Sequence, residues 1–233
     1  MLDLVWKDII QGRRALAFYL AVGAAIALGL TFAMSDVGAV VALQMTLSVY
    51  GFAVKSTYDD DKHGALLFLK GLPLSDAAIV VSKFVSTFVV AVGFAVFSWG
   101  LCVVAEGFLG PSLRLGAAAG APQGLSGLAW QILLSVAAFF GALLVVMAVY
   151  LAMFFCLGYA RAAAYNRVVM LGLFAVIMAA SAVFQRARVQ PPEWAQALGR
   201  SWAAPLLAVC AGLAVYAAGC AASLWWVRRR DWS

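Results

Sequence analysis

Long, unbroken apolar runs set the first constraint on this chain. The run LLVVMAVYLAMFFCLG covers residues 143–158, and several stretches reach the roughly 20 apolar residues that a helix needs to cross a hydrocarbon core about 30 Å thick. A membrane-spanning β-barrel would instead show short segments of alternating polarity. Hydrophobic residues make up 66% of the chain and charged residues only 11%, so a soluble fold could not cover its surface with polar groups. The sequence therefore predicts an all-α, polytopic membrane protein.

Six transmembrane helices are expected, within a single transmembrane domain over residues 1–233. The predicted spans cover about residues 15–34, 37–54, 77–104, 128–157, 168–184 and 204–227. The third and fourth are longer than a bilayer requires, which indicates tilt or extension beyond it. The connection over residues 105–127 is expected to be irregular or partly re-entrant. The connection over residues 185–203 is interpreted either as a short surface helix or as a plain loop.

Lysine and arginine are distributed unequally between the two sides of this topology. Twelve of the sixteen lie on the side of the termini: Lys7, Arg13, Arg14, Lys55, Lys62, Lys70, Lys83, Arg161, Arg167, Arg228, Arg229 and Arg230. The other four are Arg114, Arg186, Arg188 and Arg200. An excess of basic residues marks the cytoplasmic side of membrane proteins, so both termini are expected in the cytoplasm. Basic residues at span ends form no stripe for nucleic acid, and no such partner is expected.

The first 14 residues predict an amphipathic helix. One helical face is apolar and consists of Leu2, Val5, Trp6, Ile9 and Ile10, while the rest of the helix carries Asp3, Lys7, Asp8 and Arg13. Such a helix can lie in the membrane interface with its charges in water, where we expect Trp6, Lys7 and Asp8. The alternative is an extension of the first span into the cytosol.

Charge is concentrated between the second and third predicted spans, in the stretch YDDDKHGALLFLKGLPLSDAAIVVSKF (residues 58–84). Residues 58–73 predict a short cytosolic helix. Asp59 can cap its start, and Asp60 and Asp61 then suit the positive end of the helix dipole. Gly71 and Pro73 can end it, and Ser75 with Asp76 can cap the third span. The alternative is a solvated connector whose charges only fix the topology.

No catalytic, nucleotide or metal motif is found. The sequence lacks G-x-x-x-x-G-K-[ST], H-E-x-x-H and G-x-S-x-G, so neither a phosphate-binding loop nor a hydrolytic site is expected. The single histidine, His63, is interpreted as an interfacial polar residue. Ionisable residues lie at span ends or in loops, which disfavours an ion-coupled secondary transporter and suits amphipathic, peptide, drug or lipid-like cargo.

The stretch from Tyr58 to Phe84 resembles the signature of permease subunits of type-2 ABC exporters, and more narrowly that of small bacterial members with six spans. The matching residues are Asp59 to Lys62, Leu72-Pro73, Ser75-Asp76 and Lys83. The opening LVWKDI (residues 4–9) also resembles the start of this family. The chain departs from the pattern in two places, because many members carry Glu at the aspartate positions and a bulkier residue where Gly64 stands.

This resemblance implies that residues 58–73 form a coupling helix, which docks on a separate ATP-hydrolysing subunit. The implied docking residues are Asp59, Asp60, Asp61, Lys62, His63, Leu66, Phe68, Leu69, Lys70, Leu72 and Pro73. ATP and Mg²⁺ would be bound by that partner, so this chain is expected to hold no cofactor and to be no enzyme. The resemblance also implies a bacterial cytoplasmic membrane and a dimer with a second copy or a paralogue. The alternatives are a non-transporting membrane scaffold or assembly factor, and a secondary transporter.

Overall fold

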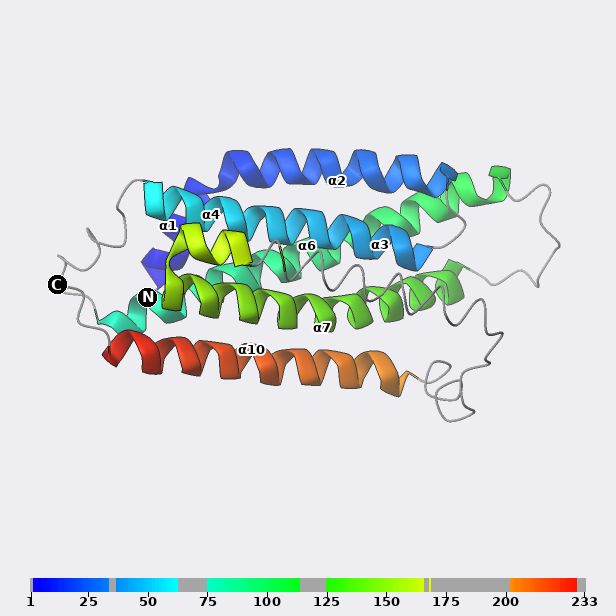
Figure 1. Ribbon diagram of the computed structural model, residues 1–233. Helices are drawn as coiled ribbons and strands as arrows, with labels where there is room; N and C mark the ends of the chain where they lie inside the picture. Colours follow the sequence, from blue (N-terminus) through cyan, green and yellow to red (C-terminus); the bar gives the residue numbers. More distant parts are fainter. Residues whose placement is uncertain are drawn as a thin grey trace.

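The computed structural model describes residues 2–33, 37–62, 75–113, 125–165, 168 and 202–229. The elements in these ranges are helices that run side by side as a bundle (Figure 1). Their bounds are α1 Leu2–Gln11, α2 Arg13–Ala33, α3 Val37–Met45, the π-helix η1 Thr46–Tyr50, α4 Gly51–Lys62, α6 Asp76–Leu113, α7 Leu125–Leu157 and α10 Ala203–Arg229. The all-α prediction is confirmed.

Three helices among the described residues are long and apolar enough to cross a membrane. These are Asp76–Ala105, Ile132–Leu157 and Ala203–Arg229. A fourth is added if Leu2–Gln11 and Arg13–Ile26, which meet at 59°, are counted as one bent span. The count of six stays a prediction, because the helices over residues 37–54 are not among these candidates and most of the fifth predicted span lies outside the described residues.

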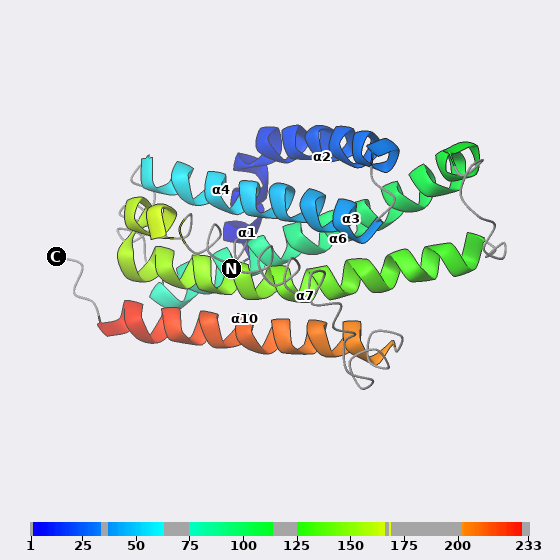
Figure 2. The ribbon, with the colours of Figure 1, turned by 45° about the vertical axis from the view of Figure 1, so that its right-hand side comes forward.

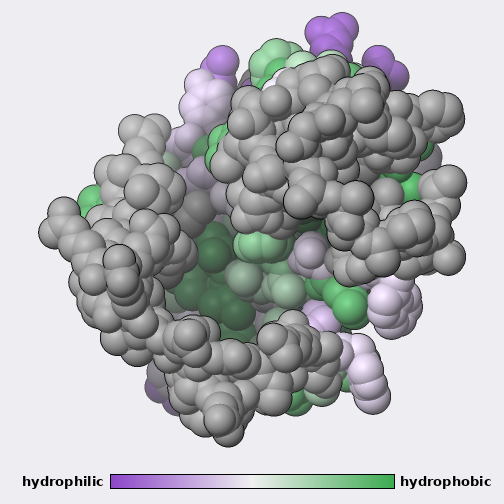
Figure 3. All heavy atoms as spheres, turned by 90° about the vertical axis from the view of Figure 1, so that its right-hand side faces the viewer, coloured by the Kyte–Doolittle hydropathy of each residue, from purple (hydrophilic) through white to green (hydrophobic). Residues whose placement is uncertain are grey.

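One end of the bundle gathers α1, the last turn of α4, the first turn of α6 and the last turns of α7 and α10 (Figures 1 and 2). We call it the basal end. The start of the first described helix and the end of the last therefore lie at the same end of the bundle, as the predicted topology requires. At the opposite end, the described atoms visible at the centre are mostly hydrophobic (Figure 3), in keeping with the apolar interior.

The start of α6 follows the local sequence. The Ser75 side chain accepts a hydrogen bond from the backbone N–H of Ala78 at 3.2 Å, which is the N-cap that the sequence predicts. The end of the helix differs from prediction. Residues 105–113, expected to be irregular or re-entrant, continue α6 to Leu113. Small residues suggested a loop, but before Pro111 every residue has the backbone N–H that an α-helix requires.

Close contact between α7 and α10 depends on small residues. The two helices run side by side in the same direction (Figure 1). A Cβ on Gly141 would overlap the backbone of Ala208, and a Cβ on Gly212 would overlap the backbone of Gly141. Small residues permit this backbone approach in membrane helices. Gly212 therefore packs within its own chain.

The end of α7 is set by Gly158, whose φ of +81° lies in the left-handed region. Its N–H donates to the Phe154 carbonyl at 2.9 Å, and its own carbonyl accepts from the Ala162 N–H at 3.0 Å. The chain thus turns out of α7 directly into the helical residues 159–165. Glycine adopts this backbone conformation without the steric penalty of a Cβ.

Candidate functional site

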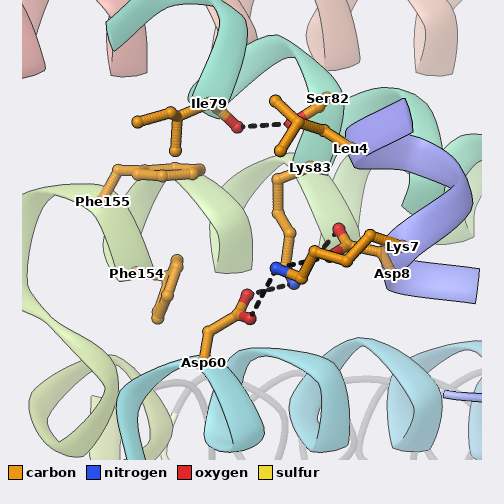
Figure 4. Close-up of a pocket in the computed structure, with 9 residues that line it drawn as sticks. All are labelled: Leu4, Lys7, Asp8, Asp60, Ile79, Ser82, Lys83, Phe154 and Phe155. Atoms are coloured by element: carbon orange, nitrogen blue, oxygen red, sulfur yellow. Dashed lines mark hydrogen bonds and ion pairs between the residues drawn. The ribbon is translucent and has the colours of Figure 1, made fainter. Parts of the chain in front are cut away.

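Four charged residues from three helices meet at the basal end of the bundle (Figure 4). We call them the basal charge cluster: Lys7 and Asp8 on α1, Asp60 on α4 and Lys83 on α6. Two positive and two negative side chains give the cluster a formal charge of zero. Its residues are far apart in the sequence, so the cluster exists only through the packing of these helices.

Lys83 is the centre of the cluster. Its ammonium group forms an ion pair with Asp60, lies 3.4 Å from the Asp8 carboxylate, and donates a hydrogen bond to Ser56 Oγ at 2.7 Å. An ammonium group has three N–H donors, and three oxygens surround this one. Its hydrogen-bonding capacity is therefore matched by acceptors from α1 and α4.

Lys7 and Ser86 complete the surroundings of the two carboxylates. Lys7 Nζ lies 3.6 Å from Asp60 and 3.4 Å from Asp8. Ser86 on α6 donates its hydroxyl to Asp8 at 3.1 Å. Each carboxylate thus contacts both lysines, so neither depends on one cation alone.

The cluster is almost completely removed from solvent. Asp60 is 4% exposed, Lys83 5% and Asp8 6%, while Lys7 remains partly exposed. Apolar side chains of Ile79, Phe154 and Phe155 line the small pocket beside the charges. Burying an ion without a partner costs several kcal/mol, so buried charges are stable only when paired and hydrogen-bonded, as they are here.

Helical spacing presents these side chains to one another. Ser56 and Asp60 are four residues apart on α4, and Lys83 and Ser86 are three apart on α6, so each pair shares one face of its helix. Lys83 is the eighth residue of α6, which places it about 10 Å along the helix axis at 1.5 Å per residue. The cluster therefore lies just inside the basal end of the bundle.

The predicted N-terminal helix is present as α1, at 59° to the helix that follows it. Leu2, Trp6 and Ile10 are exposed and form an apolar stripe at four-residue spacing. The expectation that Asp8 lies in water is wrong, because it is buried against α6. Its charge is satisfied inside the protein by Lys83 and Lys7, which amphipathicity alone could not indicate.

The predicted start of the coupling helix at Asp59 is also wrong. Helix α4 continues without a break to Lys62, so Asp59 to Asp61 form its last turn. No proline or glycine lies between Gly51 and Lys62, and the i,i+4 ion pair of Lys55 with Asp59 stabilises the extension. The other predicted docking residues lie outside the described residues: His63, Leu66, Phe68, Leu69, Lys70, Leu72 and Pro73.

The sequence singled out Lys83 but missed its partners. Asp60 was assigned to a docking surface and Asp8 to solvent, and Ser56 and Ser86 received no role. One signal could have found them, because a lysine eight residues into an apolar helix requires a nearby counter-ion. Within the described part of the chain, no group of His, Cys, Asp and Glu could hold a metal ion. The cluster instead fastens three helices together.

Comparisons with known proteins identify the family. No curated protein matches the chain. The sequence model of one family, described as "ABC-2 family transporter protein", matches residues 3–223. The match covers all the described helices, except for the first residue of α1 and the last six residues of α10. The chain therefore belongs to the ABC-2 family of transporter membrane proteins, as a permease of an ABC transporter.

Proposed function

We propose that this chain is the membrane-spanning subunit of an ATP-driven exporter, powered by a separate ATPase subunit that docks on residues 58–73. The family match over residues 3–223 carries this proposal. ABC-2 permeases are transport subunits rather than enzymes, and their family implies an ATPase partner. ATP and Mg²⁺ would be bound by that partner.

The described part of the proposed docking segment supports this role. Asp61 and Lys62 are exposed at the last turn of α4, so charged groups are available at the basal end. Asp60 faces inward to Lys83, so it contributes to docking by holding α4 in place. Residues 63–73 would supply the apolar contacts through Leu66, Phe68, Leu69 and Leu72, with His63 and Lys70 beside them and Pro73 at the end.

The remaining features of the proposal follow from composition and topology. The basal end would face the cytoplasm of a bacterial cell, since basic residues concentrate there. Two six-span copies, or one copy and a paralogue, would form the transport path with two ATPases. The apolar helices suit an amphipathic, peptide, drug or lipid-like substrate better than a bare ion.

Co-purification with the ATPase encoded beside this chain tests the proposal. Phe68→Asp and Leu69→Asp should each lower the amount of bound ATPase at least about tenfold, because a charge would be buried in an apolar contact. Leu198→Asp, an equivalent change on the predicted outer side, should leave binding intact. The proposal fails if the unaltered chain forms no complex, and the docking assignment fails if Phe68→Asp and Leu69→Asp bind ATPase normally.

A further inference from the structure

We propose that Lys83 is a positioning residue for energy coupling: by binding Asp60 and Asp8 together, it makes the ends of α4 and α6 and the helix α1 move as one unit. The role of Lys83 in transport rests on the proposed function. The clamp itself, which is the set of ion pairs centred on Lys83, is a property of this chain alone.

The position of the clamp relative to the docking segment is the first argument. Asp60 lies two residues before the end of α4, and Lys83 lies seven residues after the start of α6. Residues 63–74 lie between the end of α4 and the start of α6 in the sequence. The Asp60–Lys83 pair therefore joins the two helices that residues 63–74 connect, close to the points where this connection begins and ends.

Mechanical transmission is the second argument. A force that the ATPase applies to the connection between α4 and α6 moves the bundle only if these two helices do not slide past each other. Lys83 binds Asp60 and Ser56 on successive turns of the same face of α4, so sliding by one turn would separate Lys83 from at least one of them. Because these charges are buried, breaking them exposes unpaired ions to an apolar environment, which opposes the motion strongly.

The third argument concerns α1. Asp8 contacts Lys83, and Lys7 contacts Asp60, so the same clamp also holds the N-terminal helix. The exposed stripe of Leu2, Trp6 and Ile10 suits the membrane interface. Through the 59° bend, α1 continues into α2. A displacement of the docking segment would therefore reach α1 and α2 as well as α6.

A neighbouring ion pair provides a matched control. Lys55 and Asp59 directly precede the clamp residues Ser56 and Asp60 and form an ion pair, but both belong to α4. This pair joins two positions of one helix, so it cannot fasten α4 to a neighbour. Lys55→Met thus removes a lysine charge close to the cluster without removing a link between helices.

The clamp can be removed without leaving a buried charge unpaired. Lys83→Met alone leaves two carboxylates facing Lys7. In Asp60→Asn/Lys83→Met, one positive and one negative charge are lost together, and Lys7 remains 3.4 Å from Asp8. Replacing both members of a buried pair by uncharged side chains of similar size avoids the large cost of leaving one buried charge without its partner. The double variant therefore separates loss of the clamp from loss of folding.

Hydrogen exchange of the purified chain in lipid nanodiscs tests the clamp without any ATPase. In Asp60→Asn/Lys83→Met, backbone amides in the last turn of α4 and in α1 should exchange at least about tenfold faster, because the contacts that hold these ends together are lost. Lys55→Met should exchange like the unaltered chain. Unchanged exchange in the double variant, or an equal rise in Lys55→Met, overturns the clamp.

The coupling role is tested by comparing the ATPase complex without nucleotide and with ATP and vanadate. In the unaltered chain, nucleotide should change exchange in the docking segment, α1 and the start of α6. In the double variant, ATPase should still bind, but nucleotide should change the hydrogen exchange of residues 62–75 only. Changes that reach α1 and α6 equally in both chains overturn the role. If no ATPase binds the unaltered chain, the proposed function fails, while exchange in the chain alone still decides the clamp.

Discussion

At the scale of single residues, the chain contains both a satisfied and an unsatisfied buried polar group. Lys83 has acceptors for its three N–H donors. Gln44 on α3 is fully buried, yet within the described part of the chain neither its amide nitrogen nor its amide oxygen has a hydrogen-bond partner. The two residues predict opposite responses to substitution by an apolar side chain.

Lys83→Met should lower the free energy of unfolding by about 3–5 kcal/mol, because it leaves two buried carboxylates with one partly exposed lysine. Asp60→Asn/Lys83→Met should recover most of this loss. Thermal unfolding of the purified chain in detergent measures both variants. If the single and double variants unfold at the same temperature, the two side chains are not energetically coupled in the protein.

Gln44→Leu should stabilise the protein by about 1–3 kcal/mol, the usual cost of a buried polar group left unpaired. Gln44 lies beside Gly23 on α2, where the approach of the two helices is close. Gln11→Leu, on the exposed side of α1, should change stability by less than about 0.5 kcal/mol. A loss of stability in Gln44→Leu would mean that the amide is hydrogen-bonded when the protein is in a membrane.

At the scale of elements, the contact between α7 and α10 depends on the absence of side chains. Gly141 and Gly212 bring the two backbones together, and Ala148 contacts the next small residue of α10, Gly219. The two small residues of each helix, Gly141 and Ala148 on α7 and Gly212 and Gly219 on α10, lie seven residues apart. This spacing keeps small residues on one seam of two parallel helices.

Gly141→Ala should destabilise the protein by about 1–3 kcal/mol, because the added methyl group forces the helices apart. Gly100→Ala is the matched control, since a Cβ there meets no atom within 4 Å. With the same gain in helix propensity, up to about 1 kcal/mol, the control should be neutral or slightly stabilising. Thermal unfolding compares them, and equal stability of the two variants would refute close packing at Gly141.

At the scale of the whole molecule, the basal end contains the basal charge cluster, α1, the end of α4 and the start of α6. If this end faces the cytoplasm, Lys62→Cys should be labelled by a membrane-impermeant thiol reagent only after cells are opened. Arg114→Cys, on the predicted outer side, should be labelled in intact cells. The unaltered chain, with its four native cysteines, gives the background. Labelling of Lys62→Cys in intact cells would reverse the topology and remove the docking proposal.

The sequence alone determined the positions of several helices and the start of α6, because these features depend on interactions between residues close together in the chain. Apolar runs predicted the helices from 15–34, 128–157 and 204–227, and the structure has them at Arg13–Ala33, Leu125–Leu157 and Ala203–Arg229. Ser75 predicted the start of α6. These features depend on residues within a few turns of one another, where hydrophobicity, helix propensity and capping act directly.

The partners of the charged residues were decided only by the tertiary structure. No local pattern around Asp8, Asp60 or Lys83 predicts that they meet, since α2, α3 and η1 lie between Asp8 and Asp60, and residues 61–82 lie between Asp60 and Lys83. Several carboxylates were available to Lys83 by sequence. Which of them it binds depends on how α1, α4 and α6 pack, because only that packing excludes water and makes the pairing of buried charges obligatory.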